Sequence, residues 1–155
     1  MKTTMNPNLM KNQPNAGCAG VFDYKTSLQL LVNRLVSNSL AGIVHSKSIV
    51  VNDVPSEFFI TADENKITPV IRELLTTVIA NARNGRIYIS AERFKDIIIL
   101  QIQDRNNYNG YALGYSLKAI ECEATIIDGN ISIRGQRQLV ATISFSFPNQ
   151  SSRQN

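Results

Sequence analysis

The sequence predicts an α+β protein, a two-layer α/β sandwich in which a mostly antiparallel sheet is covered on one face by three helices. Two observations lead to this prediction. Apolar residues recur at helical spacing in three separate segments, and short runs rich in Ile and Phe lie between them. The elements follow the order helix, strand, strand three times, which favours this layered arrangement. Because the chain has 155 residues, it can bury one sizeable core, and we expect one domain.

The first expected helix lies behind two candidate capping residues, Thr26 and Ser27, and runs for about four turns. Its apolar positions are Leu28, Leu31, Val32, Leu35, Val36 and Ile43. Two short strands, residues 48–54 and 57–61, should follow, joined by a tight turn at Pro55.

The second expected helix follows Asp63, with Pro69 tolerated in its first turn, where a missing N–H costs little. Its apolar positions are Val70, Ile71, Leu74, Leu75, Val78, Ile79 and Ala82. On a helical wheel, Glu73, Thr77 and Asn81 form a polar line along the edge of this apolar half. Taken alone, such a line is typical of a solvated flank.

The remaining elements are an isoleucine-rich hairpin, a loop, a third helix and two closing strands. Their expected ranges are 86–92 and 97–103 around a turn at 93–96, then 104–110, 112–123, 125–134 and 139–147. Residues 1–20 and 149–155 are polar, lack an apolar period and are expected to be disordered tails around a domain at 21–148.

The composition limits the class of protein. The formal charge of +4 comes from sixteen Lys and Arg spread along the sequence, which suits an acidic partner or a nucleotide but gives no argument for nucleic acid. No apolar run reaches the roughly 18 residues of a membrane helix, so we expect a cytoplasmic protein without membrane contact. Cys18 and Cys122 are expected to be reduced thiols, with Cys122 in the core.

Several segments, in order, resemble the ATP-binding domain of sensor histidine kinases. Residues 69–83, PVIRELLTTVIANAR, resemble its asparagine-containing helix, and Asp104 stands where its adenine-binding aspartate ends a strand. Residues 110–117, GYALGYSL, resemble its second glycine box, usually G-x-G-L-G-L-S-I. The segments DGNISI at 128–133 and ISFSFP at 143–148 match its last two strands. Upstream, residues 22–23, 53–55 and 62–63 fit the family's entry into this domain, so the similarity covers about residues 22 to 148.

The resemblance implies a nucleotide site. Asp104 would accept a hydrogen bond from the exocyclic amine of adenine while apolar neighbours hold the base. Gly110 and Gly114 would allow phosphate to approach the start of the third helix, where free amides and the helix dipole favour anions. These three residues are therefore the first candidates for ATP or ADP binding.

The polar line of the second helix supplies the other candidates by the same resemblance. Asn81 matches an asparagine that lies beside the phosphates, and Glu73 matches the general base of the related gyrase and heat-shock chaperone ATPases. The family's magnesium-binding asparagine falls on Thr77, whose neutral hydroxyl is a poorer ligand for a hard cation than an amide oxygen.

Three further departures from the family pattern predict a degenerate site. The first glycine box, normally D-x-G-x-G, reads DRNNY from Asp104 to Tyr108, so side chains replace its glycines. Only five residues separate Asp104 from Gly110, so the lid that closes over a triphosphate is effectively absent. His45 is the one histidine and stands where the family has no catalytic histidine, which argues against autophosphorylation in cis.

Three interpretations stay open at this stage. The first is a stand-alone signalling or scaffold module in bacterial signal transduction, which keeps the kinase fold, has lost turnover, and binds magnesium and ATP or ADP weakly or not at all. The second is a genuine nucleotide sensor, or a kinase acting on a separate protein. The third is an unrelated domain whose basic surface, near Arg83, Arg86, Arg93 and Lys95, binds an acidic partner.

The expected partners of the first interpretation are a kinase or a response regulator. We also expect the first helix to pair with its counterpart in a second copy or with a kinase helix, because its apolar stripe must be covered.

Overall fold

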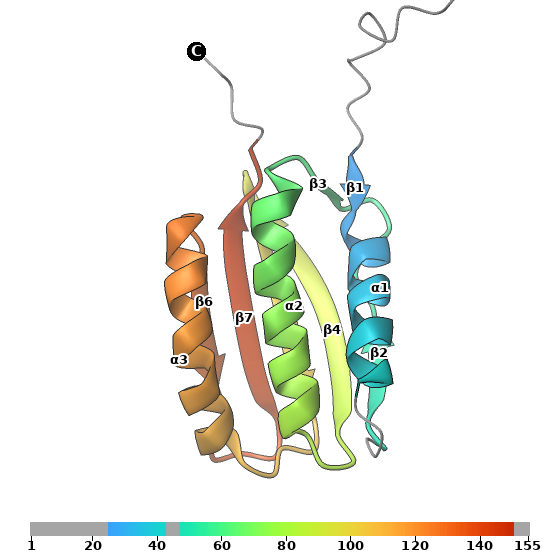
Figure 1. Ribbon diagram of the computed structural model, residues 1–155, viewed down its shortest axis with the longest axis vertical. Helices are drawn as coiled ribbons and strands as arrows, with labels where there is room; N and C mark the ends of the chain where they lie inside the picture. The colour runs from blue at the N-terminus through green and yellow to red at the C-terminus, as the bar shows by residue number, and fades with distance from the viewer. Residues whose placement is uncertain (1–24, 43–46, 151–155) are drawn as a thin grey trace, which may run out of the picture.

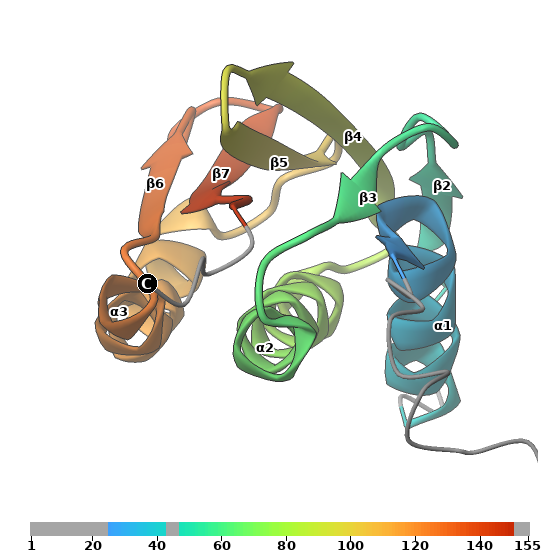
Figure 2. The ribbon, with the colours of Figure 1, turned by 90° about the horizontal axis from the view of Figure 1, so that it is seen from above.

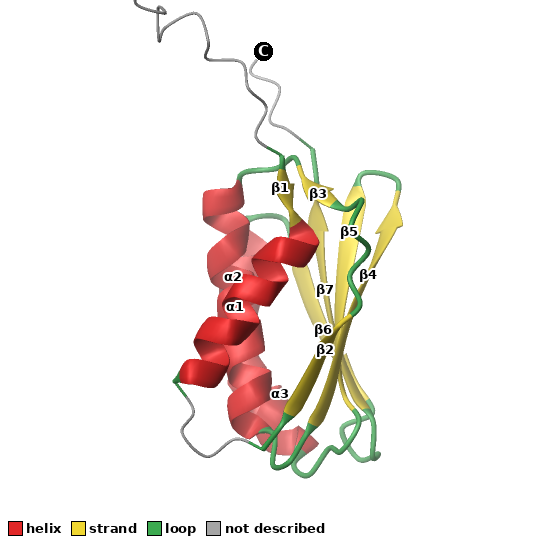
Figure 3. Cartoon of the chain, turned by 90° about the vertical axis from the view of Figure 1, so that its right-hand side faces the viewer, coloured by secondary structure: helices red, strands yellow, loops and turns green. Residues whose placement is uncertain are grey.

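The computed structural model describes residues 25–42 and 47–150 as a two-layer α+β sandwich (Figure 1). In the described chain, three helices lie side by side in one layer and the sheet forms the other, which the view from above in Figure 2 and the side view in Figure 3 both show. The helices are α1 (Leu28–Ala41), α2 (Glu64–Asn81) and α3 (Gly110–Ile126). The fold class predicted from the sequence is confirmed.

The main sheet has five strands in the order β2-β4-β5-β7-β6. Their bounds are β2 (Ile49–Asn52), β4 (Arg86–Phe94), β5 (Ile97–Asp104), β6 (Asn130–Arg134) and β7 (Ala141–Pro148). β2 runs parallel to β4, because α2 carries the chain back along the sheet between them, and the other three pairs are antiparallel. The sheet is therefore mostly antiparallel, as predicted.

A second, two-stranded sheet joins β1 (Thr26–Ser27) to β3 (Phe59–Ile60) at the end where the chain enters α1. The strand predicted at 57–61 thus pairs with the segment before α1, and not with the strand that precedes it across Pro55. Ser27 ends β1 and also caps α1, since its hydroxyl accepts a hydrogen bond from the amide of Leu30.

The helix boundaries correct the predicted ones in two places. Asp63 caps α2 directly, accepting from the amide of Asn65, so Pro69 lies inside the helix and not in its first turn. A proline there leaves the carbonyl of Asn65 without its helical donor, and the exposed position of Asn65 lets water serve instead. α3 continues to Ile126, so the strand predicted from residue 125 begins only at Asn130.

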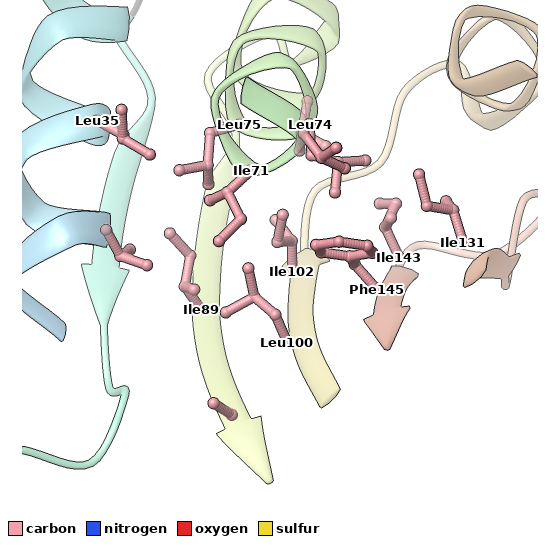
Figure 4. Packing of buried hydrophobic residues seen from close by; sticks show 14 of the residues in the cluster. Leu35, Ile71, Leu74, Leu75, Ile89, Leu100, Ile102, Ile131, Ile143 and Phe145 are labelled. Atoms are coloured by element: carbon pink, nitrogen blue, oxygen red, sulfur yellow. The ribbon is translucent and has the colours of Figure 1, made fainter. Parts of the chain in front are cut away.

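The apolar stripes of the helices meet the inner face of the sheet in one core (Figure 4). Leu35, Ile71, Leu74 and Leu75 point toward the sheet, where Phe145 is fully buried. The apolar stripe of α1 was predicted to pack against a second copy or a kinase helix. In the structure it is covered within the chain. Position 43 of that stripe and His45 lie outside the described residues.

Two further predictions fail on burial. Cys122 is a free and exposed thiol, because the buried line of α3 is Leu113, Leu117, Ile120 and Ala124 and residue 122 falls on another face. Asn149, predicted as the start of a frayed tail, is buried. Its side chain accepts from the amide of Thr61 at 2.8 Å and donates to the carbonyl of Phe59 at 2.9 Å, so the ordered chain extends past β7.

In the described residues no helix is both long and apolar enough to cross a bilayer.

Candidate functional site

The predicted site residues gather at one end of the molecule, the lower end in Figure 1. There α2 ends, β5 ends, α3 begins, and the turn from β6 to β7 lies close by. The antiparallel register places Asp104 of β5 opposite Ala141 of β7, and the amide of Arg105 donates to the carbonyl of Arg86 at 2.8 Å. The site is therefore built from segments far apart in the sequence.

The polar line of α2 reaches this end at Asn81 alone. Asn81 is half-buried, and its amide nitrogen donates to the carbonyl of Asn109 at 3.3 Å, just before α3. Thr77 is half-buried one turn earlier, and Glu73 is exposed two turns earlier. The side chain predicted to lie beside phosphates thus ties α2 to the start of α3.

Asp104 is 1% exposed at the end of β5. One carboxylate oxygen accepts from the backbone amide of Asn106 at 3.0 Å. Burial raises the pKa of the Asp104 carboxyl above its usual value, and the hydrogen bond from Asn106 opposes this shift without cancelling it. The second oxygen has no hydrogen-bond partner among the described residues, so it keeps the acceptor capacity that an adenine amine would need.

The space beside the two glycines at the start of α3 is filled by another segment of the chain. A Cβ added at Gly110 would lie 2.3 Å from the carbonyl oxygen of Gln136, and one at Gly114 would lie 2.9 Å from the Nε2 atom of Gln136. The absence of a side chain therefore lets the β6–β7 turn approach the helix.

One of the amides that α3 leaves free at its start is also engaged. The side chain of Asn109 accepts from the amide of Ala112 at 3.2 Å, and its carbonyl accepts from the amide of Leu113 at 3.2 Å. A helix start can bind phosphate through its free amides, and here the side chain of Asn109 takes up the amide of Ala112.

The short loop between β5 and α3 is fastened to the β6–β7 turn by Asn107. Its amide donates to the carbonyl of Leu139 at 2.8 Å, and its side chain donates to the carbonyls of Gln136 and Gln138 at 3.2 and 2.9 Å. The sequence analysis missed Asn107 and Gln136. Neither position carries a local signal, because their contact joins segments 29 residues apart.

A shallow hollow of about 480 Å³ opens where this loop, the start of α3 and the β6–β7 turn meet. Its lining consists of Asn107, Tyr108, Asn109, Gly110, Tyr111, Gln136, Arg137, Gln138 and Leu139. Asp104 does not line it. The buried carboxylate and the hollow are therefore separate features of the same end.

These residues offer few ligands to a magnesium-bound triphosphate. Mg²⁺ is held by carboxylates, waters and phosphate oxygens, and in the described parts of the chain no three His, Cys, Asp or Glu residues come together as a metal site. Thr77 would offer one neutral hydroxyl, and Asn81 would offer its amide oxygen, since its hydrogen bond to Asn109 uses the amide nitrogen. Thr77 and Asn81 would therefore be two neutral oxygen ligands, without an acidic cluster beside them in the described residues.

Comparison with known proteins gives a match in structure. No model of a protein family and no curated protein matches the sequence. The histidine kinase AdeS of Acinetobacter baumannii is 16% identical with a TM-score of 0.67, over 81% of this chain and 66% of that one. The catalytic domain of the histidine kinase ThkA is 15% identical with a TM-score of 0.59, over 82% of this chain and 95% of that one. The chain has the fold of a histidine kinase catalytic domain.

A third match shows how much of a larger protein this fold represents. Full-length ShkA, solved in complex with AMPPNP, is 14% identical with a TM-score of 0.64, over 83% of this chain and 31% of that one. The chain thus corresponds to one part of such a protein. At this level of identity the likeness shows the histidine kinase fold alone, which confirms the expectation drawn from the sequence motifs.

Proposed function

We propose that this chain is a regulatory module of a bacterial signalling pathway, which keeps the histidine kinase fold, does not turn over ATP, and acts through contacts with a protein. A kinase or a response regulator is the expected partner class, and the cytoplasm is the expected location. The fold supports the signalling class, and the local contacts support the loss of turnover.

The observation that carries the proposal is the position of Gln136. Its carbonyl fills the space beside Gly110, and its side chain fills the space beside Gly114. A phosphate group would need that same space, together with helix-start amides, of which Asn109 already caps that of Ala112. Binding a triphosphate would require the β6–β7 turn to move and its hydrogen bonds with Asn107 to break.

The second candidate function, a genuine ADP or ATP sensor, rests on Asp104. This carboxylate is retained at the end of β5, is buried, and keeps one oxygen without a partner among the described residues. It could still recognise an adenine amine even where the phosphates are held poorly.

Calorimetric titration with magnesium and ADP separates the two candidates. The proposal expects no saturable heat below about millimolar nucleotide, which corresponds to a binding free energy weaker than about −4 kcal/mol. Asp104→Asn is the matched control, because it keeps the size and the acceptor for Asn106 but removes the charge. Micromolar binding in the parent protein that is lost in Asp104→Ala and weakened in Asp104→Asn would overturn the proposal in favour of the sensor.

A further inference from the structure

The end of the molecule that holds the candidate site is strongly basic. Six exposed Lys and Arg side chains lie in the segments that meet there, and we call them the basic end: Lys47, Arg83, Arg86, Arg105, Arg134 and Arg137. The one acidic residue in those segments is the buried Asp104. The rest of the described chain has ten acidic and seven basic residues, so the small net charge of the protein hides a marked separation of charge.

Strand register brings these residues together. Arg86 lies opposite Ile49 at the start of β2, two residues after Lys47, and Arg134 lies opposite Thr142 at the start of β7. By contrast, Arg93 and Lys95 lie at the β4–β5 turn, at the opposite end of the same strands. The basic surface suggested by the sequence is thus divided between two ends, and only one of them gathers further arginines.

The arginines of the basic end are not neutralised by neighbouring carboxylates. In the part of the chain that the structure describes, the salt bridge found joins Arg34 to Glu64, and neither belongs to this end. Three guanidinium groups lie over tyrosine rings instead: Arg83 over Tyr108 at 4.8 Å, Arg105 over Tyr88 at 4.3 Å, and Arg137 over Tyr111 at 5.6 Å. Such stacking restricts the side chains. Arg105 also donates two long hydrogen bonds to the side chain of Gln103 and Arg137 donates one to the hydroxyl of Tyr111, and each guanidinium keeps further N–H groups that could bind carboxylates.

Apolar side chains accompany these charges. Leu139 is 65% exposed and Val140 is 40% exposed, and both lie in the β6–β7 turn. Leu139, Tyr111 and Arg137 line the hollow of about 480 Å³ described above. A hollow where one exposed leucine lies beside tyrosine and arginine, among polar side chains, contains the residue types that are enriched at protein interfaces.

We infer that the basic end is a docking surface for an acidic protein segment that inserts one apolar side chain into the hollow beside Leu139 and Tyr111. The inference rests on the proposed function, since it gives the chemistry of the protein partner. Nucleic acid is a poorer fit, because it stacks bases on open aromatic faces and gains little from exposed aliphatic groups. Here three tyrosines already carry a guanidinium on one face, and two aliphatic residues stand exposed beside them.

The test uses fluorescence anisotropy with the full chain and a labelled peptide of four glutamates on each side of one phenylalanine. We expect saturable binding at low ionic strength that weakens at least tenfold when salt is raised to about 0.15 M, since exposed charges are screened over about 8 Å there. Exchanging the phenylalanine of the peptide for serine should weaken binding about fivefold to tenfold, the effect of losing one apolar anchor.

Matched variants locate the binding surface. Arg105→Glu and Arg137→Glu should each weaken binding about tenfold, whereas Arg93→Glu, with the same change of charge at the opposite end, should change it less than about twofold. Leu139→Ser should remove the preference for the phenylalanine peptide and leave the salt dependence intact. Circular dichroism of each variant checks that the fold is retained.

Three results would overturn the inference. Absence of binding at low salt is one, and an equal loss in Arg93→Glu, which would mean attraction by net charge alone, is another. The third is tighter binding of single-stranded oligothymidylate than of the peptide, which would make the basic end a nucleic-acid surface. None of these results alters the nucleotide titration, so failure here and failure of the proposed function can be told apart.

Discussion

The two sides of α2 retain the histidine kinase pattern to different degrees. The inner side, with Leu74 and Leu75 fully buried against the sheet, is a complete apolar face. On the outer line, Glu73 is exposed, Thr77 is half-buried with no acidic cluster beside it in the described residues, and the amide nitrogen of Asn81 donates to the backbone of Asn109. The difference shows that a buried apolar side is enough to maintain the fold. The polar side chains that could bind a ligand are not needed for it and can form contacts within the chain.

The largest effect should come from the inner side. Leu75→Ala deletes a fully buried side chain and should lower the free energy of unfolding by about 2 to 5 kcal/mol, measured by urea denaturation. Glu73→Ala, on the exposed line of the same helix, should change it by less than about 0.5 kcal/mol. Equal effects of the two substitutions would remove the contrast between the two sides.

An intermediate effect is expected at the start of α3. Gly110→Ala places a Cβ against the backbone of Gln136 and should destabilise the protein by about 1 to 3 kcal/mol, because the turn must move. Gly42→Ala is the control, since its φ is −78° and its Cβ would meet nothing closer than 3.7 Å. If Gly110→Ala were as neutral as the control, the glycine would not be required for packing against the turn.

The pH dependence of stability should reveal Asp104. Because burial raises the pKa of this carboxyl in the folded state, the folded protein keeps the proton to a higher pH than the unfolded chain does. Stability is therefore lost as pH rises from the unfolded value of about 3.9 through the raised folded value. In urea denaturation across this range, Asp104→Asn should gain stability relative to the parent protein as pH increases. A difference that stays flat would mean that the carboxylate is well solvated.

The smallest effect is expected for Asn81→Ala. The substitution removes a long hydrogen bond of 3.3 Å from a half-buried side chain, and alanine is the better helix former, so the two changes offset each other to within about 0.5 kcal/mol. Thermal unfolding monitored by circular dichroism checks this value. A loss of more than about 2 kcal/mol would show that the contact with Asn109 holds α3 in place.

Local patterns were sufficient for the layers of the fold. The periodic apolar residues of α1 and α2 and the isoleucine-rich hairpin predicted both the helices and the sheet face they cover. Boundaries failed where a contact distant in sequence decided them: β3 pairs with Thr26 and Ser27, and Asn149 is buried by its bonds to Phe59 and Thr61.

The candidate site was predicted only in part for the same reason. The position of Asp104 at a strand end and of Asn81 near the start of α3 follows from the order of the elements. The role of Gln136 could not follow, because nothing in its own segment indicates that it will pack against Gly110. The charge pattern was likewise hidden, since arginines that are far apart in sequence meet only through the register of β2, β4 and β7.

The central claim is that the groups suited to phosphate are engaged by the chain itself, and amide chemical shifts test it most directly. In ¹⁵N-resolved NMR spectra with magnesium and ATP added to about a millimolar, the amides of Gly110, Ala112 and Gly114 should show no saturable shift, as expected for a site weaker than this concentration. Saturable shifts of these three amides at micromolar ATP, with loss of the Asn107 contacts, would contradict the account.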